Sequence, residues 1–545
     1  MTMTKSPYFF PALLSFAICA LLCATSLLLR PAFPVDETRY LTVAWEMHQS
    51  GNWILPTLNL EAYHHKPPVL FWLINLMWAI FGVSQQSAML VPYLAGFSVL
   101  MLTARLSTRL FPDTPNAPLL SVALLGGSLP FVIYSNLIMF DLLLSVFVMV
   151  GVTAIWDYFK TGKNIHLLTL AVAIGLGAIT KGPVILLHLA PAIIFMKLWT
   201  DANTRPALKS WLPKFLGALL LGVAIGLCWA IPAAIEGGKE FAEKIFYGQT
   251  AGRMVNAFDH KQPAYWYLIF IPLLLMPWIF IPAIWQKTRD IFHEKSPVFK
   301  FLSLWIVSVF MAFCAISGKQ VHYLLPLLPP TALLMTSIML RLPENLNNKN
   351  IWSLVTGLAT LILLPHIVHG ITELFETEPT AAYLDTVLEE TNIIILPAIA
   401  LLMIGAIITH KGNSFKTIIT TSLVMAVMMC GFQFSVKTSF FKHYDLTPIA
   451  QFITPLEDRP MAFAGNYAGE FGFMARRSHA ITEITRETIA DWFAKNPTGI
   501  VIVFDKVRNR SKYDIYTVLF EMPFRMTSQY MILELKDQPT AIAYN

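Results

Sequence analysis

The chain has 545 residues, of which 56% are hydrophobic and only 13% are charged. Soluble globular proteins carry about 25% charged residues, so this composition excludes a soluble protein and indicates a polytopic membrane protein. The net charge is +6, and in a membrane protein such an excess of basic residues usually lies in cytoplasmic loops. No nucleic-acid-binding signature is present. All five cysteines fall in apolar segments, and neither a disulfide framework nor a metal site is visible among them.

The first apolar segment, residues 8–29, is long enough to span a hydrocarbon core of ~30 Å. Lys5 precedes it, as a basic residue precedes the apolar part of a signal peptide, but no small-residue cleavage pattern comes before Arg30. We therefore expect this segment to stay in the protein as its first membrane helix.

Further apolar segments of similar length follow along the chain. With the first, they make about thirteen candidate spans, at residues 8–29, 88–105, 118–138, 142–159, 165–180, 182–199, 215–234, 264–286, 300–317, 322–340, 351–370, 392–409 and 417–436. Segment 67–82 is also apolar but short for a full span. If it does not cross, and if the N-terminus is cytoplasmic, most Lys and Arg residues of the connections lie inside, as the positive-inside rule requires. We therefore predict a juxtamembrane or re-entrant helix at 67–82.

The composition changes from about Thr438, where charges become frequent and long apolar runs stop. This part alternates between short apolar runs and a longer mixed segment, which favours strands around a helix. The predicted strands are 460–465, 499–505 and 530–536, and the predicted helix covers 481–496 with its start near Thr482 or Thr485.

These patterns predict two domains. The first is a transmembrane domain over residues 1–437, whose first external loop covers residues 30–87. The second is a small α/β domain over residues 438–545. With an odd number of spans and a cytoplasmic N-terminus, this C-terminal domain is expected on the outer face, which is the periplasm of a Gram-negative cell.

Two carboxylates are expected at the outer face of the membrane. Asp36 follows the first span, with Glu37 and Arg39 beside it, and Asp141 lies in an apolar stretch where spans 118–138 and 142–159 meet. A carboxylate in an apolar run is energetically costly, which favours a functional role. If the two converge, they can act as a base and an orienting group, or bind a metal or an amine. The alternatives are a solvated loop and a carboxylate that reaches water.

Several basic residues also lie at the outer ends of predicted spans. Pro67 and Pro68 directly follow the first of these residues, Lys66, and stiffen the chain there. These cations are Lys66, Lys181, Arg253 and Lys319. Each can simply extend to the membrane interface, but several at one level indicate an anionic ligand such as a lipid phosphate. His64 and His65 are candidate metal ligands, although adjacent histidines are more often exposed.

The first external loop carries a family resemblance. Asp36-Glu37 followed by "RYLTVAWEMHQSGNWILPTLNLEAYHHKPPVLFWL" resembles the same loop in membrane glycosyltransferases of the polyprenyl-phosphate-dependent protein mannosyltransferase (GT-C) superfamily, and within it the lipid A 4-amino-4-deoxy-L-arabinose transferases. The resemblance covers most of the chain. It continues in Asp141, "TKGP" at 180–183, "QPAYWYL" at 262–268, "MPW" at 276–278 and "SGKQVHYLLPLLPP" at 317–330.

The resemblance implies a mostly α-helical integral membrane protein of the GT-C type, with juxtamembrane helices around an external cavity, in the bacterial inner membrane. It implies an inverting transfer of a sugar, aminoarabinose or a related one, from undecaprenyl phosphate to lipid A or another envelope glycan. Asp36 corresponds to the main catalytic carboxylate and Asp141 to the second. The residues expected to bind substrate or phosphate are Glu37, Arg39, Lys66, Lys181, Arg253, Lys319 and Tyr323.

The chain departs from this family at His65, because Glu usually precedes the Lys-Pro pair and is linked to a metal site in some members. A divalent metal cofactor therefore stays open, with His64 and His65 as candidate ligands. Two other functions are also consistent with the sequence. One is a protein O-glycosyltransferase that acts on exported proteins. The other is a lipid or sugar transporter, which predicts ionisable residues near the bilayer midplane and paired broken helices.

Overall fold

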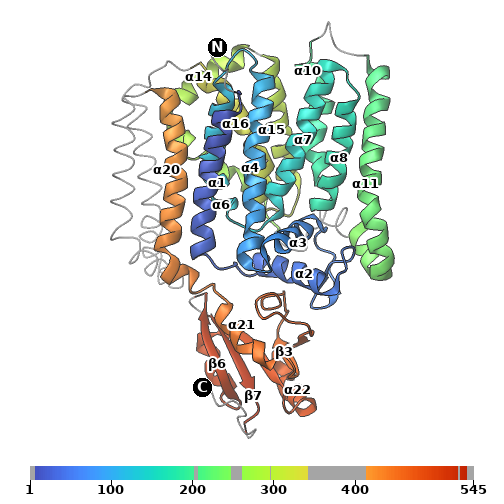
Figure 1. Cartoon of the computed structure of the whole chain (residues 1–545), viewed down its shortest axis with the longest axis vertical. Coiled ribbons are helices and arrows are strands. Elements are labelled where there is room, and N and C mark those ends of the chain that lie inside the picture. The colour runs from blue at the N-terminus through green and yellow to red at the C-terminus, as the bar shows by residue number, and fades with distance from the viewer. Residues whose placement is uncertain are drawn as a thin grey trace.

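The computed structural model describes residues 6–201, 207–246, 261–294, 296–341, 413–525 and 528–536. Within them, a bundle of long helices carries a small sheet domain at one end, and the first described turns of α1 lie at the opposite end of the bundle (Figure 1). This confirms the predicted fold class, a mostly helical membrane protein with a small C-terminal α/β domain. The predicted spans 351–370 and 392–409 lie outside the described residues.

Seven helical segments in the described residues are long and apolar enough to cross a membrane. They are α1 (Phe9–Leu29), α4 (Gln85–Leu110), α7 (Phe140–Thr161), α11 (Leu208–Glu243), α15 (Pro297–Ala315), the continuous pair η3 (Val321–Leu327) and α16 (Leu328–Met339), and α20 (Ser414–Ser435). Two shorter apolar helices, α8 (Ile165–Lys181) and α9 (Val184–Ile194), pack with them. The total of thirteen spans is not confirmed by these residues.

Three predicted spans are broken into shorter helices where Gly or Pro interrupts the helical hydrogen bonds. At Gly127, a Cβ atom would lie 2.6 Å from the Cα of Ser422, so the break occurs where α20 approaches too closely for any side chain. The pieces are α5 (Ala117–Gly126) and α6 (Leu129–Tyr134); α9 and α10 (Met196–Trp199); and α13 (Trp266–Leu274), η2 (Trp278–Phe280) and α14 (Pro282–Glu294).

Segment 30–87, predicted as the first external loop, folds at the end of the bundle nearest the sheet domain (Figure 1). It contains helix α2 (Asp36–Ser50), a small hairpin of β1 (Thr57–Leu58) and β2 (Glu61–Ala62), and helix α3 (Val69–Phe81). Helix α2 begins with two acidic residues, which its N-terminal dipole favours, and ends at Gly51 with φ 68°. Segment 67–82 therefore forms a short helix that packs beside α2, in line with the predicted juxtamembrane helix.

The C-terminal domain follows α20 through a π-helical turn, Lys437–Phe441. Its sheet has the order β4-β3-β5-β7-β6, in which β3 pairs in parallel with β4 and β5, and β7 pairs antiparallel with β5 and β6. The elements are α21 (Thr447–Ile453), η5 (Thr454–Leu456), β3 (Met461–Ala464), β4 (Thr482–Ile484), η6 (Arg486–Thr488), α22 (Ile489–Lys495), β5 (Ile500–Lys506), η7 (Val507–Tyr513), β6 (Thr517–Phe524) and β7 (Ser528–Glu534). Helices α21 and α22 cover opposite faces of the sheet.

The three strands predicted here correspond to β3, β5 and β7, whereas β6 was not predicted. The helix predicted over 481–496 is wrong at its start, because Thr482–Ile484 pairs with β3 as strand β4. Thr485 is the correct start: its side chain and that of Thr488 form a capping box. A strand next to a helix cap satisfies the same local pattern as a longer helix.

Candidate active site

The centre of the site is a buried ion pair. Asp141 lies in the first turn of α7 and is only 2% exposed, and its carboxylate is ion-paired with Nζ of Lys181, the last residue of α8. Nε2 of His322 lies 3.9 Å from the other carboxylate oxygen. Because a buried carboxylate needs such partners to offset its desolvation, Asp141 is held inside the protein and does not extend to water.

Lys66 and Tyr323 lie around this pair. Nζ of Lys181 is 4.5 Å from the ring centroid of Tyr323, and Nζ of Lys66 is 5.8 Å from the ring centroid of Phe140, the residue before Asp141. Lys66 is also within electrostatic range of the Asp141 carboxylate. Two lysines therefore share the surroundings of one buried carboxylate.

The second carboxylate differs in its exposure. Asp36 opens helix α2 with a side chain that is 51% exposed, and its Oδ1 lies 3.6 Å from Nη1 of Arg39. Both Asp36 and Asp141 act electrostatically on Tyr40, whose buried hydroxyl has a pKa raised well above its ordinary value, first by burial and then by the Asp36 charge. His322 is likewise in range of both carboxylates. The two carboxylates therefore both act electrostatically on the same two side chains, Tyr40 and His322.

Glu37 is buried and bound by other groups of the protein. It is 2% exposed and ion-paired with Arg30, and it accepts hydrogen bonds from the backbone N–H groups of Phe33 at 2.8 Å and Ile138 at 2.6 Å. These contacts tie the start of α2 to the end of α1 and to the segment before α7. Glu37 therefore positions the loop that carries Asp36, and the sequence analysis did not anticipate its partner Arg30.

The Lys319 ammonium group is also hydrogen-bonded within the protein. It is 3% exposed, and its Nζ donates to the backbone carbonyl of Gln262 at 3.0 Å and to that of Ile316. The neighbouring Tyr267 hydroxyl donates to the Gln320 carbonyl at 3.0 Å. These bonds fix the chain just before η3, which carries His322 and Tyr323 into the site. Arg253, the remaining predicted cation, lies outside the described residues.

The candidate metal ligands His64 and His65 lie side by side, with ring centroids 4.3 Å apart. In the part of the chain that the structure describes, no group of three or more His, Cys, Asp or Glu side chains is arranged to hold a metal ion. Two adjacent imidazoles do not make a metal site by themselves, since structural and catalytic sites need at least a third protein ligand.

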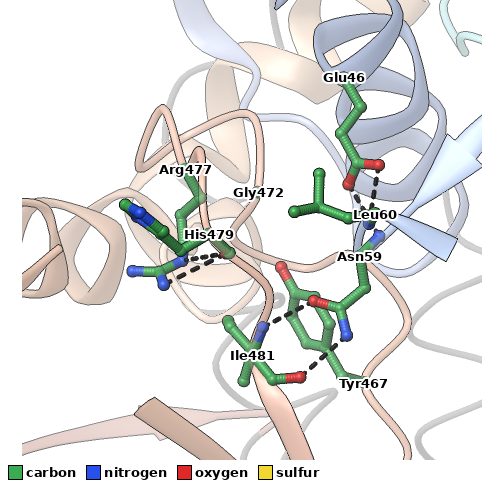
Figure 2. A pocket seen from close by; sticks show the side chains of 8 residues that line it. All are labelled: Glu46, Asn59, Leu60, Tyr467, Gly472, Arg477, His479 and Ile481. Atoms are coloured by element: carbon green, nitrogen blue, oxygen red, sulfur yellow. Dashed lines mark hydrogen bonds between the residues drawn. The ribbon is translucent and has the colours of Figure 1, made fainter. Parts of the chain in front are cut away.

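The C-terminal domain packs against the side of segment 30–87 that faces away from the helical bundle (Figure 1). A hollow at the junction is lined by α2, the β1–β2 hairpin and segment 467–481, as Figure 2 shows. There Glu46 accepts from the N–H groups of Asn59 at 2.7 Å and Leu60 at 3.0 Å, and burial raises the pKa of this carboxyl. The Asn59 side chain also donates to the Ile481 carbonyl at 2.8 Å and accepts from its N–H at 2.7 Å.

Three comparisons bear on the identity of this chain. Residues 65–230 match the family model described as dolichyl-phosphate-mannose-protein mannosyltransferase. An undecaprenyl phosphate-α-4-amino-4-deoxy-L-arabinose arabinosyl transferase from Enterobacter sp. (strain 638) is 27% identical over 61% of this chain and 59% of its own length. One of the same name from Pseudomonas savastanoi pv. phaseolicola is 33% identical over 57% of each chain.

Among solved structures, that of ArnT from Cupriavidus metallidurans bound to undecaprenyl phosphate matches with a TM-score of 0.77 at 15% identity, and covers 95% of this chain and 97% of that one. This chain therefore has the same fold, and it is a multi-pass membrane protein. It aligns with about three fifths of the length of the curated relatives. These findings confirm the predicted resemblance to the GT-C glycosyltransferases close to lipid A aminoarabinose transferase.

Proposed function

We propose that this protein is an inverting glycosyltransferase that moves a sugar, 4-amino-4-deoxy-L-arabinose or a close relative, from undecaprenyl phosphate to lipid A. The observation that carries the proposal is the buried Asp141–Lys181 pair with Lys66 in electrostatic range, together with Asp36, whose charge acts on the same Tyr40 hydroxyl as the charge of Asp141. The names of the similar proteins support the donor and the type of reaction. The acceptor, lipid A, is the one that the resemblance of the first external loop implies.

The proposed reaction needs a stabilised leaving group. An acceptor oxygen attacks the anomeric carbon of the sugar, the bond from that carbon to the phosphate oxygen breaks, and the electron pair leaves with undecaprenyl phosphate. Lys66 and Lys181 supply positive charge where the phosphate gains negative charge, and in a site largely shielded from water this stabilisation is stronger than in solution. Asp141 keeps the Lys181 side chain in place through their ion pair.

Asp36 acts on the side of the acceptor. If the acceptor is a hydroxyl group, its proton passes to the Asp36 carboxylate as the new bond forms. If the acceptor is an ionised phosphate of lipid A, no proton has to move, and Asp36 orients the sugar or stabilises its developing positive charge. The half-exposed position of this carboxylate gives an acceptor access to it from the water side.

The proposed location is the bacterial inner membrane, with the N-terminus in the cytoplasm and the sheet domain in the periplasm. Two features support it: the first described turns of α1 and the sheet domain lie at opposite ends of the bundle, and the predicted connections on the N-terminal side carry most of the basic residues. The site then opens at the periplasmic face, where lipid-linked sugars meet envelope acceptors.

The test uses the full chain purified in lipid, with an undecaprenyl-phosphate-linked sugar as donor and lipid A as acceptor. Mass spectrometry of lipid A measures the added sugar. We expect a pentosamine-sized increment with the wild type and a loss of rate on the order of 10²-fold or more for Asp36→Asn. Asp113→Asn is the matched control, because Asp113 is an exposed carboxylate in the connection between α4 and α5.

An unmodified lipid A in the presence of active donor would contradict the acceptor. Transfer of the sugar to exported proteins instead, with release of undecaprenyl phosphate and detected by glycopeptide mass spectrometry, would support the protein O-glycosyltransferase that the sequence also allowed. No consumption of the donor under any condition would contradict the glycosyltransferase itself.

A further inference from the structure

One contact between the C-terminal domain and α2 is made by a hydroxyl group that forms two hydrogen bonds, that of Thr42. Thr42 is 1% exposed, and its Oγ1 donates to the Gly469 carbonyl at 2.8 Å and accepts from the Phe473 N–H at 3.0 Å. A threonine hydroxyl can donate one hydrogen bond and can also accept hydrogen bonds. Here Thr42 makes one bond of each kind with the same segment of the C-terminal domain.

Two more residues of α2 make the same kind of contact. Nε of Arg39 donates to the Ala468 carbonyl at 3.3 Å, and Nε1 of Trp45 donates to the Arg477 carbonyl at 3.0 Å. Arg39, Thr42 and Trp45 follow one another at intervals of three, so they form one stripe along α2. Segment 468–477 therefore runs beside the outer face of the helix that begins with Asp36.

The approach is close enough to require glycine. A Cβ atom on Gly472 would lie 2.3 Å from Cγ2 of Thr42, and Gly469 has a φ of +84° and would place a Cβ atom 2.6 Å from Leu58. Around these glycines the contact is broad, because Phe473 stacks on Trp78 with ring centroids 5.2 Å apart and planes 6° apart. Packing, glycine fit and hydrogen bonding at one place indicate a built interface.

The same contact reaches the proposed catalytic carboxylate. The Arg39 guanidinium binds the Ala468 carbonyl through Nε while its Nη1 lies 3.6 Å from Asp36. On the inner side, α2 is held by its apolar face and by Glu37. Without the outer contact, the first turn of α2 keeps only its inner support, and small displacements of a reacting group cost large factors in rate.

We propose that the C-terminal domain is a fixed part of the active site, and that Thr42 and Gly472 are positioning residues through which it holds Asp36 in place. The docked arrangement is the working one, and the domain does not leave as a lid during turnover. This inference rests on the proposed function, because its readout is the transfer of a sugar.

The first experiment asks whether the docked state is active. In the double variant Thr42→Cys/Gly472→Cys, the two Cβ atoms would lie about 3.2 Å apart, slightly less than in an ordinary disulfide, so a small shift closes the bond. The reduced double variant lacks the Thr42 hydroxyl and carries a Cβ atom at position 472, so its kcat is already lower than that of the wild type, and we expect oxidation to leave that rate unchanged or to raise it. A locked protein that is inactive and recovers on reduction would overturn the proposal, because a lid would then have to open.

The second experiment asks whether the docking positions Asp36. Thr42→Ala removes both hydrogen bonds, and we expect kcat to fall by about tenfold with little change in KM for the donor, whereas Thr42→Ser, which keeps the hydroxyl, retains the wild-type kcat. Thr103→Ala is the control, since Thr103 is equally buried but its hydroxyl bonds only within α4, to the Val99 carbonyl. A general loss of stability would affect the Ser variant and the control as well.

Gly472→Ala gives an independent version of this test, because it adds only the methyl group that meets Thr42, and we expect the same fall in kcat. A wild-type kcat in both Thr42→Ala and Gly472→Ala would overturn the positioning role while leaving the proposed function intact. A wild type that transfers no sugar would instead contradict the proposed function, and with it the inference that depends on it.

Discussion

At the scale of single residues, Asp36 and Glu37 show how adjacent carboxylates take different tasks. Both lie in the first turn of α2, but Asp36 faces water while Glu37 is enclosed by Arg30 and two backbone N–H groups. A helix turns by about 100° per residue, so neighbours in sequence face different surroundings. One carboxylate is available for chemistry, and the other holds the loop together.

This difference predicts opposite outcomes for two matched substitutions. Glu37→Gln leaves Arg30 buried without its charge partner, so we expect the free energy of unfolding to fall by about 3 kcal/mol. Asp36→Asn changes a half-exposed group and leaves the unfolding midpoint unchanged while it lowers the transfer rate. Thermal unfolding in detergent, followed by intrinsic fluorescence, measures the stability of both variants. The assignment of roles is wrong if Asp36→Asn is the less stable of the two.

The sequence allowed Asp141 to be identified, because a carboxylate in an apolar run has few structural explanations. It did not identify His322 or Arg30, although both contact the predicted carboxylates. A histidine in an apolar segment and an arginine at the end of a span are common in membrane proteins, so neither stands out without the fold. The pairing of Asp141 with Lys181 likewise depends on how α7 and α8 pack, which no local pattern specifies.

At the scale of elements, the start of α22 shows where local patterns are ambiguous. Residues 481–496 contain apolar residues at helical spacing, but Thr482–Ile484 is drawn into the sheet by the exposed edge of β3. The β-branched residues of this segment suit a strand, and the capping box at Thr485 then begins the helix. Tertiary pairing decided the boundary, and this is information that a sequence window does not contain.

Another element of this domain gives a pH prediction. Burial alone would raise the pKa of Glu457, but the N–H of Ser478, the Arg477 guanidinium and the His479 ring outweigh it and lower the pKa below the ordinary 4.5. A carboxyl with a lowered pKa stabilises the fold fully above its unfolded value, and that contribution is lost as the pH falls through the folded pKa. We therefore expect the C-terminal domain to weaken as the pH falls below about 4.5.

Glu457→Gln removes this contribution at neutral pH, so its unfolding midpoint should be lower at pH 7 and should change less than the wild type between pH 7 and pH 4. Asp491→Asn is the control, because Asp491 is an exposed carboxylate of α22. Unfolding of the full chain as a function of pH, followed by tryptophan fluorescence, makes the measurement. Parallel pH profiles for wild type and Glu457→Gln would contradict the assignment.

At the scale of the whole molecule, the proposed orientation can be tested by chemical labelling. A cysteine at Ser511 lies on the exposed surface of the sheet domain, and one at Asp113 lies in the connection between α4 and α5. In a background without the native cysteines, we expect an impermeant maleimide to label Ser511→Cys in spheroplasts, and Asp113→Cys only after lysis. The reverse pattern would place the N-terminus outside and invert the positive-inside assignment.

The class of fold could be predicted from the sequence, because it depends on the composition of long segments. The change near Thr438 is visible for the same reason. The sequence did not specify which apolar segments are continuous helices, since the break at Gly127 occurs where α20 approaches too closely for a side chain, and this contact depends on the fold. It gave no sign that the last domain docks on the first loop. That contact joins residues more than 400 positions apart, such as Asn59 and Ile481, which are 422 apart.

The reciprocal bonds between Asn59 and Ile481 also order events during synthesis. The loop that carries Asp36 leaves the ribosome early, whereas its partner segment emerges only after the whole bundle has been made. With the proposed function and orientation, a nascent chain carries the Asp36 carboxylate in an incompletely supported loop until the sheet domain has been exported and folded. Acquisition of activity would then be the last step of biogenesis, and chains that stall before it would remain inert in the membrane.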